Sequence, residues 1–476
     1  MGYGVLGRVE NWNLDRCRAR NILFFQVNAS ESRPLPREFP LTPFEEYLYW
    51  EDRRSYPYWM VLKCIFKGKL DRERLEAAFA EAITNHPLAT ATLERRKGRL
   101  CWRLNPEAVP DIHFETVERR GGDPDYPRFD LAYEGALRFF VRSDASGFDF
   151  FFQIHHSAFD GLGGFQILRE VFLRYGQAGD PTIEIPRVDV EALAFREDLG
   201  KTDAETRLSI WKGLLVSLVM RIRQGSPLLP HAIPADDEPP PPNWPNVVSH
   251  RFDPEAFSDL RKVAKTEKVS LNEILVRDFQ VALGAWRRAE GFGRDADWIR
   301  VTVPINLRGW DDRYLSACNG VSVVTLDRQM KSLRRERRPR LLFRANEDME
   351  AIRKQGLDRL FWKMLGIYRK LPGGIRARFG PKRGISTAVF THLGRLFGSG
   401  PLLNAERKVV LGEAVMEDMR LTAPIRPLSL VSVDSYIYAN RLSTDLHYDG
   451  RFFEEAQMRS LMEMFVAEVE SSRRGE

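Results

Sequence analysis

The chain has 476 residues, of which 43% are hydrophobic and 29% are charged, a balance typical of globular proteins and not of disordered ones. The formal net charge of +6 is small for this length and does not by itself indicate a nucleic-acid partner. The four cysteines are widely spaced without a Cys-x-x-Cys pair, so neither a zinc site nor a disulfide framework is indicated. The cysteine pattern fits a reducing cytoplasm, and with no signal-peptide pattern and no apolar run of about 20 residues we expect a soluble protein or one peripheral to a membrane.

This length favours two domains, because single hydrophobic cores stop growing at about 250–300 residues. Residues 1–37 carry mixed signals and are assigned as an N-terminal extension. A helix is predicted from Pro43, with Thr42 as N-cap and Glu45 completing a capping box. A strand over 60–66 and an amphipathic helix that begins near 70 and ends at His86-Pro87 follow. Strands are also predicted over 98–104 and 111–117.

The most informative stretch covers residues 152–164. Strands over 136–142 and 148–154 read as an antiparallel pair, and apolar residues at helical spacing predict a helix over 164–175. His155, His156, Asp160 and Gly161 therefore lie in a turn between a buried strand and a helix. A histidine held there by the core can face a cavity, as a general base requires.

The two histidines should not share a role, because adjacent residues of an extended chain point to opposite sides. Asp160 precedes a glycine that permits an unusual turn. We expect it to fix the loop by pairing with a cation or with backbone amides. The residue types alone leave a second interpretation open, a buried histidine pair beside a loop-capping aspartate.

Residues 190–225 are helical in pattern, and their apolar positions between Leu208 and Ile222 form a broad face. This face suits a core helix that bridges two lobes, or alternatively an interfacial helix or lid beside a lipid-binding tunnel. Residues 226–247 are proline-rich and predict a semi-rigid linker. We place the domain boundary there, between an N-terminal lobe over 38–225 and a C-terminal lobe over 248–476.

The second lobe is predicted to begin with a strand near 247–252 and a helix near 254–265. A longer helix starts at Ser270 and Glu273, which form a capping box. Strands over 298–303 and 321–326 flank the run from Pro304 to Arg308 and the pair Asn319-Gly320. Further strands are expected over 387–393, 430–438 and 442–448, with a final helix over 454–470.

Residues 328–383 are strongly basic, with aromatic side chains interspersed. Such a run is usually a solvated helical face. The alternatives are a site for the phosphates of coenzyme A, for an acidic carrier-protein helix, or for an anionic membrane surface. Nucleic acid is not expected, because no recognised nucleic-acid module surrounds the segment.

The string His155-His156-x-x-x-Asp160-Gly161, after an aromatic strand and before a helix, resembles the signature of a known superfamily. It includes chloramphenicol acetyltransferase, peptide-synthetase condensation domains, alcohol acetyltransferases and the wax ester synthase/diacylglycerol acyltransferase group. The resemblance implies an α/β fold of two chloramphenicol acetyltransferase-like lobes, each a mixed sheet with flanking helices, around a central tunnel. It also implies that His156 is the general base, Asp160 a structural anchor, His155 a residue packed behind the loop, and Gly161 a turn at the tunnel.

The resemblance extends weakly over residues 38–470, with one departure. No arginine follows His86-Pro87, where condensation domains have one that is thought to pair with the motif aspartate. Arg95, Arg308 or backbone bonds would have to serve Asp160 instead. Thr391 aligns with a serine that borders the tunnel in relatives, with His392 in place of an asparagine. A hydroxyl there could stabilise an oxyanion; the alternative is that this position is simply the end of a surface strand.

The expected function is therefore an acyltransferase that moves an acyl group from a thioester to a hydroxyl or amine acceptor. Acyl-coenzyme A or acyl-phosphopantetheine would be a co-substrate, with no metal and no permanently bound cofactor. Expected partners are a small-molecule acceptor and an acyl carrier protein acting in trans. Two alternatives remain: a non-catalytic, condensation-like scaffold, and a peripheral lipid acyltransferase that contacts a membrane.

Overall fold

The computed structural model describes residues 36–106, 108–200, 238–379 and 386–475. Its first six-stranded sheet is built around β7 (Gly147–His155), in which every residue is buried. Phe150 packs against Phe172 of helix α3 (Gly161–Gln177) on one face, while Phe151 contacts Tyr126 of the 117–135 loop on the other. Because both faces are covered, the strand is a continuous apolar run and not an alternating one.

The strand order of this first sheet is β12-β13-β2-β7-β6-β5. Its other members are β2 (Trp59–Lys67), β5 (Ile112–Thr116), β6 (Leu137–Asp144), β12 (Val410–Leu411) and β13 (Ala414–Thr422). The β6–β7 pair is antiparallel, as the sequence predicted, and β5 pairs in parallel with β6. Helix α2 (Arg72–Thr84) packs beside α3.

The second six-stranded sheet has the order β10-β9-β11-β14-β15-β8. Its members are β8 (Asn246–Arg251), β9 (Trp298–Asn306), β10 (Val321–Gln329), β11 (Ala388–Arg395), β14 (Val431–Tyr438) and β15 (Arg441–Tyr448). Strand β11 runs parallel to both of its neighbours, so this sheet is also mixed. Helices α6 (Leu271–Ala289) and α10 (Glu455–Arg473) cover it through Phe279 and Phe465, which both contact Phe390. The predicted α/β class with two mixed sheets is confirmed.

Smaller elements complete the described chain. A three-stranded sheet is formed by β1 (Glu38–Pro40), β4 (Arg99–Arg103) and β3 (Thr92–Arg96). The remaining helices are α1 (Pro43–Glu51), α5 (Pro254–Glu267), α7 (Met330–Arg335), α8 (Arg338–Gln355), α9 (Leu360–Lys370) and the 3-10 helices η2 (Pro87–Ala89), η3 (Glu191–Asp198), η5 (Asp311–Tyr314) and η6 (Leu357–Arg359). Among the described residues, no helix combines the length and the apolar character needed to cross a bilayer.

Several local predictions are confirmed and one is wrong. Thr42 with Glu45 and Ser270 with Glu273 form the predicted capping boxes. Helix α3, however, begins at Gly161 and not at Gly164, because the side chain of Asp160 accepts the N–H of Gly163 and caps the helix. Of the helix predicted over 190–225, residues 191–198 form η3, and most of the rest lies outside the described residues, as does most of the predicted linker.

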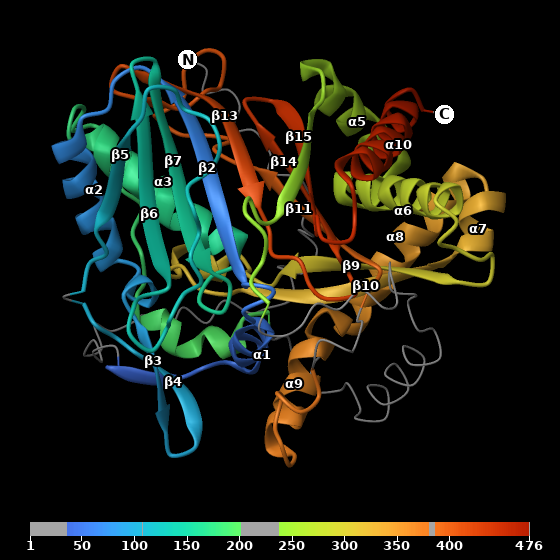
Figure 1. Cartoon of the computed structure of the whole chain (residues 1–476), viewed down its shortest axis with the longest axis horizontal. Helices are drawn as coiled ribbons and strands as arrows, with labels where there is room; N and C mark the ends of the chain where they lie inside the picture. Colours follow the sequence, from blue (N-terminus) through green and yellow to red (C-terminus); the bar gives the residue numbers. More distant parts are fainter. Residues whose placement is uncertain (1–35, 107, 201–237, 380–385, 476) are drawn as a thin grey trace, which may run out of the picture. The chain divides into compact units, whose positions relative to one another are not determined.

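The two sheets do not divide the chain into consecutive halves. Strands β12 and β13 belong to the segment assigned to the C-terminal lobe, yet β13 pairs along its length with β2 of the first sheet (Figure 1). Strand pairing satisfies the backbone groups at the edge of β2, which would otherwise be exposed. A lobe over 248–476 therefore does not match the sheet membership of β12 and β13, although residues 36–476 form one compact unit.

Candidate active site

His156 lies directly after β7, where the strand gives way to the turn that leads into α3. Within residues 147–160, all of which the structure describes, every residue is buried except His156, which is partly exposed. Its backbone N–H donates to the carbonyl of Tyr58 at the start of β2, at 3.0 Å. The sheet therefore fixes the backbone of this histidine while its ring reaches the surface of the core.

The hydrogen bonds of His156 define its tautomer. Nδ1 lies 3.0 Å from the carbonyl oxygen of Phe159. Because a carbonyl can only accept, Nδ1 carries the proton and Nε2 carries the free lone pair. Burial lowers the pKa of His156 below its usual value, although the bond to Phe159 and the charge of Asp160 act in the opposite direction. The ring is therefore neutral at pH 7, in the form that accepts a proton.

Two further residues hold His156 in place. The ring of Tyr58 stacks on its imidazole, with centroids 5.4 Å apart and an angle of 12° between the planes. The side-chain amide of Asn319 donates to its backbone carbonyl at 2.6 Å. Both the ring and the main chain of this residue are thus supported by groups remote in sequence.

His155 points away from His156 into the core and is only 1% exposed. Its Nδ1 accepts the backbone N–H of Ser157 at 3.1 Å, so its proton resides on Nε2, 3.6 Å from a carboxylate oxygen of Asp52. Burial alone would raise the pKa of Asp52, but His155, Arg128 and the N–H of Tyr58 together hold it below its usual range. His155 thus packs behind the motif.

Asp160 has the contacts of a structural anchor. One oxygen accepts the N–H of Gly163 at 2.7 Å, and the other accepts the N–H of Gly320 at 2.8 Å. Arg308 donates to both oxygens, at 2.8 and 3.2 Å. Although burial disfavours the charged form of Arg308, the Asp160 carboxylate raises its pKa above the usual range. Of the partners that the sequence suggested, Arg308 and backbone N–H groups together hold Asp160, and Arg95 does not contact it.

Arg308 belongs to the segment between β9 and β10, which crosses from the second sheet onto α3. Its guanidinium also donates to the carbonyl of Cys318 at 2.8 Å and lies against Gly320, where a Cβ would approach its Cζ to 2.6 Å. A Cβ on Gly163 would come within 2.5 Å of the Cys318 carbonyl oxygen. The contact at Gly163 is with main-chain atoms, so α3 and the crossing segment meet backbone to backbone there, whereas the contact at Gly320 is with the Arg308 side chain of the same segment.

A second anchor holds the same segment further along. His86 is fully buried, with Nε2 3.1 Å from a carboxylate oxygen of Glu170 on α3. Its Nδ1 accepts the N–H of Ala317 at 3.1 Å and lies near the hydroxyl of Ser316. The His86-Pro87 motif therefore supports the crossing segment. Arg95, the other arginine suggested as a partner of Asp160, instead donates to the carbonyl of Gly98 in its own hairpin.

The remaining predicted residues, Gly161 and Thr391, lie at the start of α3 and within β11. A Cβ on Gly161 would meet the side chain of Leu393 at 3.2 Å, so the start of α3 lies against this strand. Thr391 precedes Leu393 by two positions, which places both on the same face of β11. Thr391 is partly exposed, and burial lowers the pKa of the neighbouring His392 to about 4.

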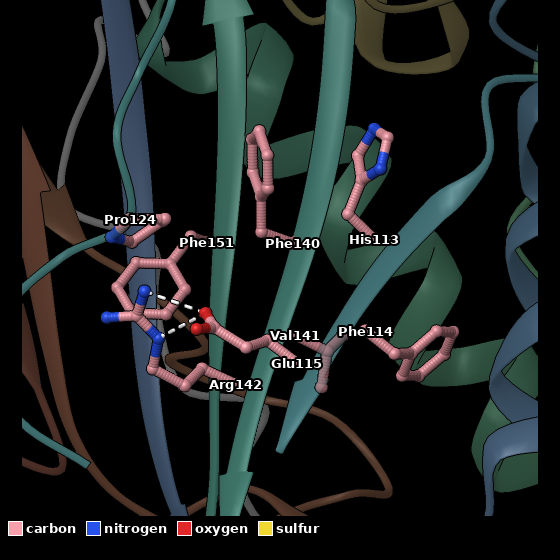
Figure 2. A pocket seen from close by; sticks show the side chains of 8 residues that line it. All are labelled: His113, Phe114, Glu115, Pro124, Phe140, Val141, Arg142 and Phe151. Atoms are coloured by element: carbon pink, nitrogen blue, oxygen red, sulfur yellow. Dashed lines mark hydrogen bonds and ion pairs between the residues drawn. The ribbon is translucent and has the colours of Figure 1, made fainter. Parts of the chain in front are cut away.

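A pocket of about 110 Å³ lies elsewhere, on the face of the first sheet away from α3. Figure 2 shows it over β5 and β6, between the rings of His113, Phe140 and Phe151 and beside the Arg142–Glu115 ion pair. None of the motif residues lines it. The tunnel implied by the resemblance remains a prediction.

Much of the basic segment is neutralised within the described chain. Arg334 pairs with Asp295, Arg338 with Glu468, and Arg353 with Glu273. Lys354 and Arg369 also pair with glutamates, Glu350 and Glu46. Part of this run is therefore a set of helical faces tied to neighbouring acidic residues.

Sequence reasoning assigned no site role to Tyr58, Asp52 or Asn319. Tyr58 and Asp52 lie just before β2, with nothing in the local pattern to mark them. Asn319-Gly320 did carry a signal, because the pair sits just before a strand after the Pro304–Arg308 run. Their contacts with His156 and Asp160 span 163 and 160 residues.

No protein-family model matches the sequence. An uncharacterized protein of Mycobacterium tuberculosis is 24% identical over 290 residues, which span 58% of this chain and 64% of that protein. A component of the linear gramicidin synthase of Brevibacillus parabrevis is 25% identical over 272 residues, 52% of this chain but only 5% of that protein. The chain thus matches less than two thirds of these curated relatives.

Solved structures match over almost the whole chain. The first condensation domain of the CDA synthetase superposes with a TM-score of 0.66 and 15% identity, covering 91% of this chain and 95% of that one. An epimerization domain of tyrocidine synthetase B gives 0.64 and 13%, covering 94% and 99%. The trichothecene 15-O-acetyltransferase of Fusarium sporotrichioides gives 0.64 and 15%, covering 91% and 94%. This chain therefore has the fold shared by these condensation, epimerization and acetyltransferase proteins.

Proposed function

We propose that this protein is an acyltransferase that moves an acyl group from a thioester to a hydroxyl or amine, with His156 as general base. The observation that carries the proposal is the state of His156. It is the one partly exposed residue in a buried run, and its Nδ1 proton is committed to the Phe159 carbonyl. A neutral imidazole with a free Nε2 is the form that a general base needs.

The reaction follows from that state. Nε2 of His156 takes the proton of the acceptor O–H or N–H as the acceptor attacks the thioester carbonyl. The tetrahedral intermediate collapses with cleavage of the C–S bond, and the imidazolium returns the proton to the leaving thiolate. His156 accepts the acceptor's proton and returns it to the leaving thiolate. Because the acceptor attacks the thioester directly, no covalent acyl-enzyme is needed. Asp160 and Arg308 take no part in proton transfer and hold the turn that presents the base.

The oxyanion of the intermediate needs a hydrogen-bond donor, and Thr391 is our candidate. It shares a face of β11 with Leu393, which lies against Gly161 next to the motif. The thioester would enter as acyl-coenzyme A or as an acyl-phosphopantetheine on a carrier protein in trans. The carrier form is included because several proteins with this fold are domains of peptide synthetases.

The test is thiol release from a panel of acyl-coenzyme A donors and acylated carrier protein, with pooled alcohol and amine acceptors. We expect wild type to release thiol with formation of an ester or amide. His156→Ala should lose activity by at least a hundred-fold, since general-base catalysis contributes about 10²–10⁴-fold. His113→Ala is the matched control, because His113 is an exposed histidine of the edge strand β5. It should leave the rate unchanged.

Two outcomes would count against the proposal. Equal product formation by wild type and His156→Ala would remove His156 from the chemistry. Failure of wild type to transfer an acyl group from either donor class would favour the scaffold interpretation instead.

A further inference from the structure

Many cations in the described part of the chain have acidic partners, but most of those at the tip of the β3–β4 hairpin are not paired with a carboxylate. The sequence from Arg95 to Arg99 contains four cations and one glycine, and all five residues are exposed. Arg96 pairs with Glu38 and Glu94. Arg95 is directed to the carbonyl of Gly98 and not to a carboxylate. The hairpin tip therefore presents more positive charge than its neighbours neutralise.

A second basic tip is formed by the end of α9 and the turn after it. Residues 356–379 contain six cations and one acidic residue. Arg369 is neutralised by Glu46 at 2.7 Å, whereas Lys370 and Arg376 are exposed, and Arg376 lies over the ring of Trp50. Two large apolar side chains of the same segment are also exposed, Ile367 by 48% and Leu371 by 42%.

The two tips belong to one face of the molecule. Strand β4 pairs with β1, which leads directly into α1, and Phe44 of α1 stacks on Trp362 of α9. Arg369 also donates to the carbonyl of Leu41, between β1 and α1, at 2.7 Å. Figure 1 shows both the β3–β4 hairpin and α9 projecting to the lower edge of the view. A flat surface at that edge can touch both.

We propose that this face binds an anionic membrane surface. We call it the basic face and define it by Arg95, Lys97, Arg99, Lys370 and Arg376 together with Ile367 and Leu371. The cations are attracted to anionic lipid headgroups. The apolar side chains enter the boundary between headgroups and acyl chains, as on the apolar face of an interfacial helix. This inference goes beyond acyl transfer and does not depend on it.

An acidic protein is the competing partner for a basic surface, but the geometry favours a membrane. The exposed apolar residues belong to α9 and the turn after it, and this helix projects at the lower edge of Figure 1. The charges come from two separate projections, which suits a planar partner. Acidic proteins therefore enter the test as an alternative outcome.

The experiment is flotation of the full chain with phosphatidylcholine vesicles, with and without about one third phosphatidylserine, at low and high salt. We expect flotation with the anionic vesicles at low salt and much less at high salt. Arg95→Gln/Lys97→Gln/Arg99→Gln should lower the partition coefficient about a hundred-fold, taking roughly a five-fold loss for each cation removed. Ile367→Ser/Leu371→Ser should weaken the binding that persists at high salt.

The matched control is Lys262→Gln/Lys265→Gln/Lys268→Gln. These three exposed lysines lie on and just after α5, at the upper edge of Figure 1. The control has the same net charge as the hairpin variant and should bind like wild type. Equal losses in the two triple variants would overturn the proposal, as would absence of wild-type flotation with anionic vesicles at low salt. Binding of an acidic carrier protein that the hairpin substitutions abolish, without vesicle binding, would assign the face to a protein.

Discussion

The imidazole of His156 keeps its proton on Nδ1, and this makes a pH profile informative. Because burial lowers the pKa of His156 below its usual value of 6.5, the neutral, proton-accepting form persists below that pH. We expect kcat/KM to be constant through neutrality and to fall as pH drops through the lowered pKa, below 6.5. The measurement is the pH dependence of kcat/KM with a saturating acceptor. An acidic limb centred above pH 6.5 would contradict the assignment.

Asp52 has a positioning role that can be separated from the chemistry. One of its oxygens accepts the N–H of Tyr58 at 2.9 Å, and the other faces Nε2 of His155. Tyr58 and His155 flank His156, so Asp52→Asn should shift the base and lower kcat by about ten- to a hundred-fold, with little change in KM. The acidic limb should stay in place, because His156 itself remains. Asp123→Asn, at a half-exposed pair with Lys63, is the control; equal losses would show a general effect of the lost charge.

Single residues divide clearly into those that the sequence revealed and those it could not. His156 and Asp160 could be identified from the sequence because they lie only four residues apart, in the same turn. The partner of Asp160 is 148 residues away, and the sequence narrowed it to Arg95, Arg308 or backbone bonds. Asp52 and Tyr58 act through a backbone N–H and a ring stack, which leave no pattern in a single sequence.

At the scale of elements, α3 and the crossing segment are in such close contact that adding one methyl group should force them apart. The Cβ of Gly163→Ala would lie 2.5 Å from the Cys318 carbonyl oxygen, and neither backbone can yield without disturbing Asp160. We expect a loss of about 1–3 kcal/mol in the free energy of unfolding, typical of overpacking, together with reduced kcat. Chemical denaturation and steady-state rates measure the two effects.

A second helical glycine provides the control. A Cβ on Gly366 of α9 meets only the Cγ of Pro43 among the described residues, at 4.0 Å. Gly366→Ala should therefore stabilise the protein by about 0.5–1 kcal/mol through the better helix propensity of alanine. Destabilisation by both substitutions alike would mean that the crossing segment is not the cause.

Most element types could be predicted because periodicity and capping are local properties. The starts of α1 and α6 followed from Thr42 and Ser270, whose capping partners lie three residues further along the chain. The start of α3 was predicted three residues too late because Gly161, Gly163 and Gly164 have low helix propensity, so the first turn of the helix does not look helical in the sequence. Their helical state depends on the cap at Asp160 and on the close approach of the crossing segment, which propensity does not report.

At the scale of the whole molecule, the order of predicted strands and helices along the sequence indicated two sheets, but it did not show which strands connect the two. The pairing of β13 with β2 places residues about 350 positions apart side by side, as in Arg420 opposite Lys63. No local pattern assigns a strand to one sheet or the other. The proline-rich stretch indicated a boundary in the sequence, but β12 and β13, which follow it, belong to the first sheet.

Asp445 connects the two sheets, and its removal should show how much that connection stabilises the fold. The fully buried carboxylate accepts from Arg251 of β8 at 2.8 Å, from Tyr436 of β14 at 2.9 Å, and from the N–H of Leu421 of β13 at 3.2 Å. Asp445→Asn leaves Arg251 without its main counter-charge. We expect a loss of about 3–5 kcal/mol in the free energy of unfolding at pH 7.

The pH dependence of that loss tests its electrostatic origin. Burial would raise the pKa of Asp445, but Arg251 and Ser249 together hold it below its usual value. A carboxyl with a lowered pKa stabilises the fold above the unfolded-state value of about 3.9, and this contribution is lost as pH falls through the lower, folded value. The difference between wild type and Asp445→Asn in urea should therefore be largest near pH 7 and shrink below about pH 4. A difference that stays constant down to pH 3 would mean that the charge of Asp445 does not join the sheets.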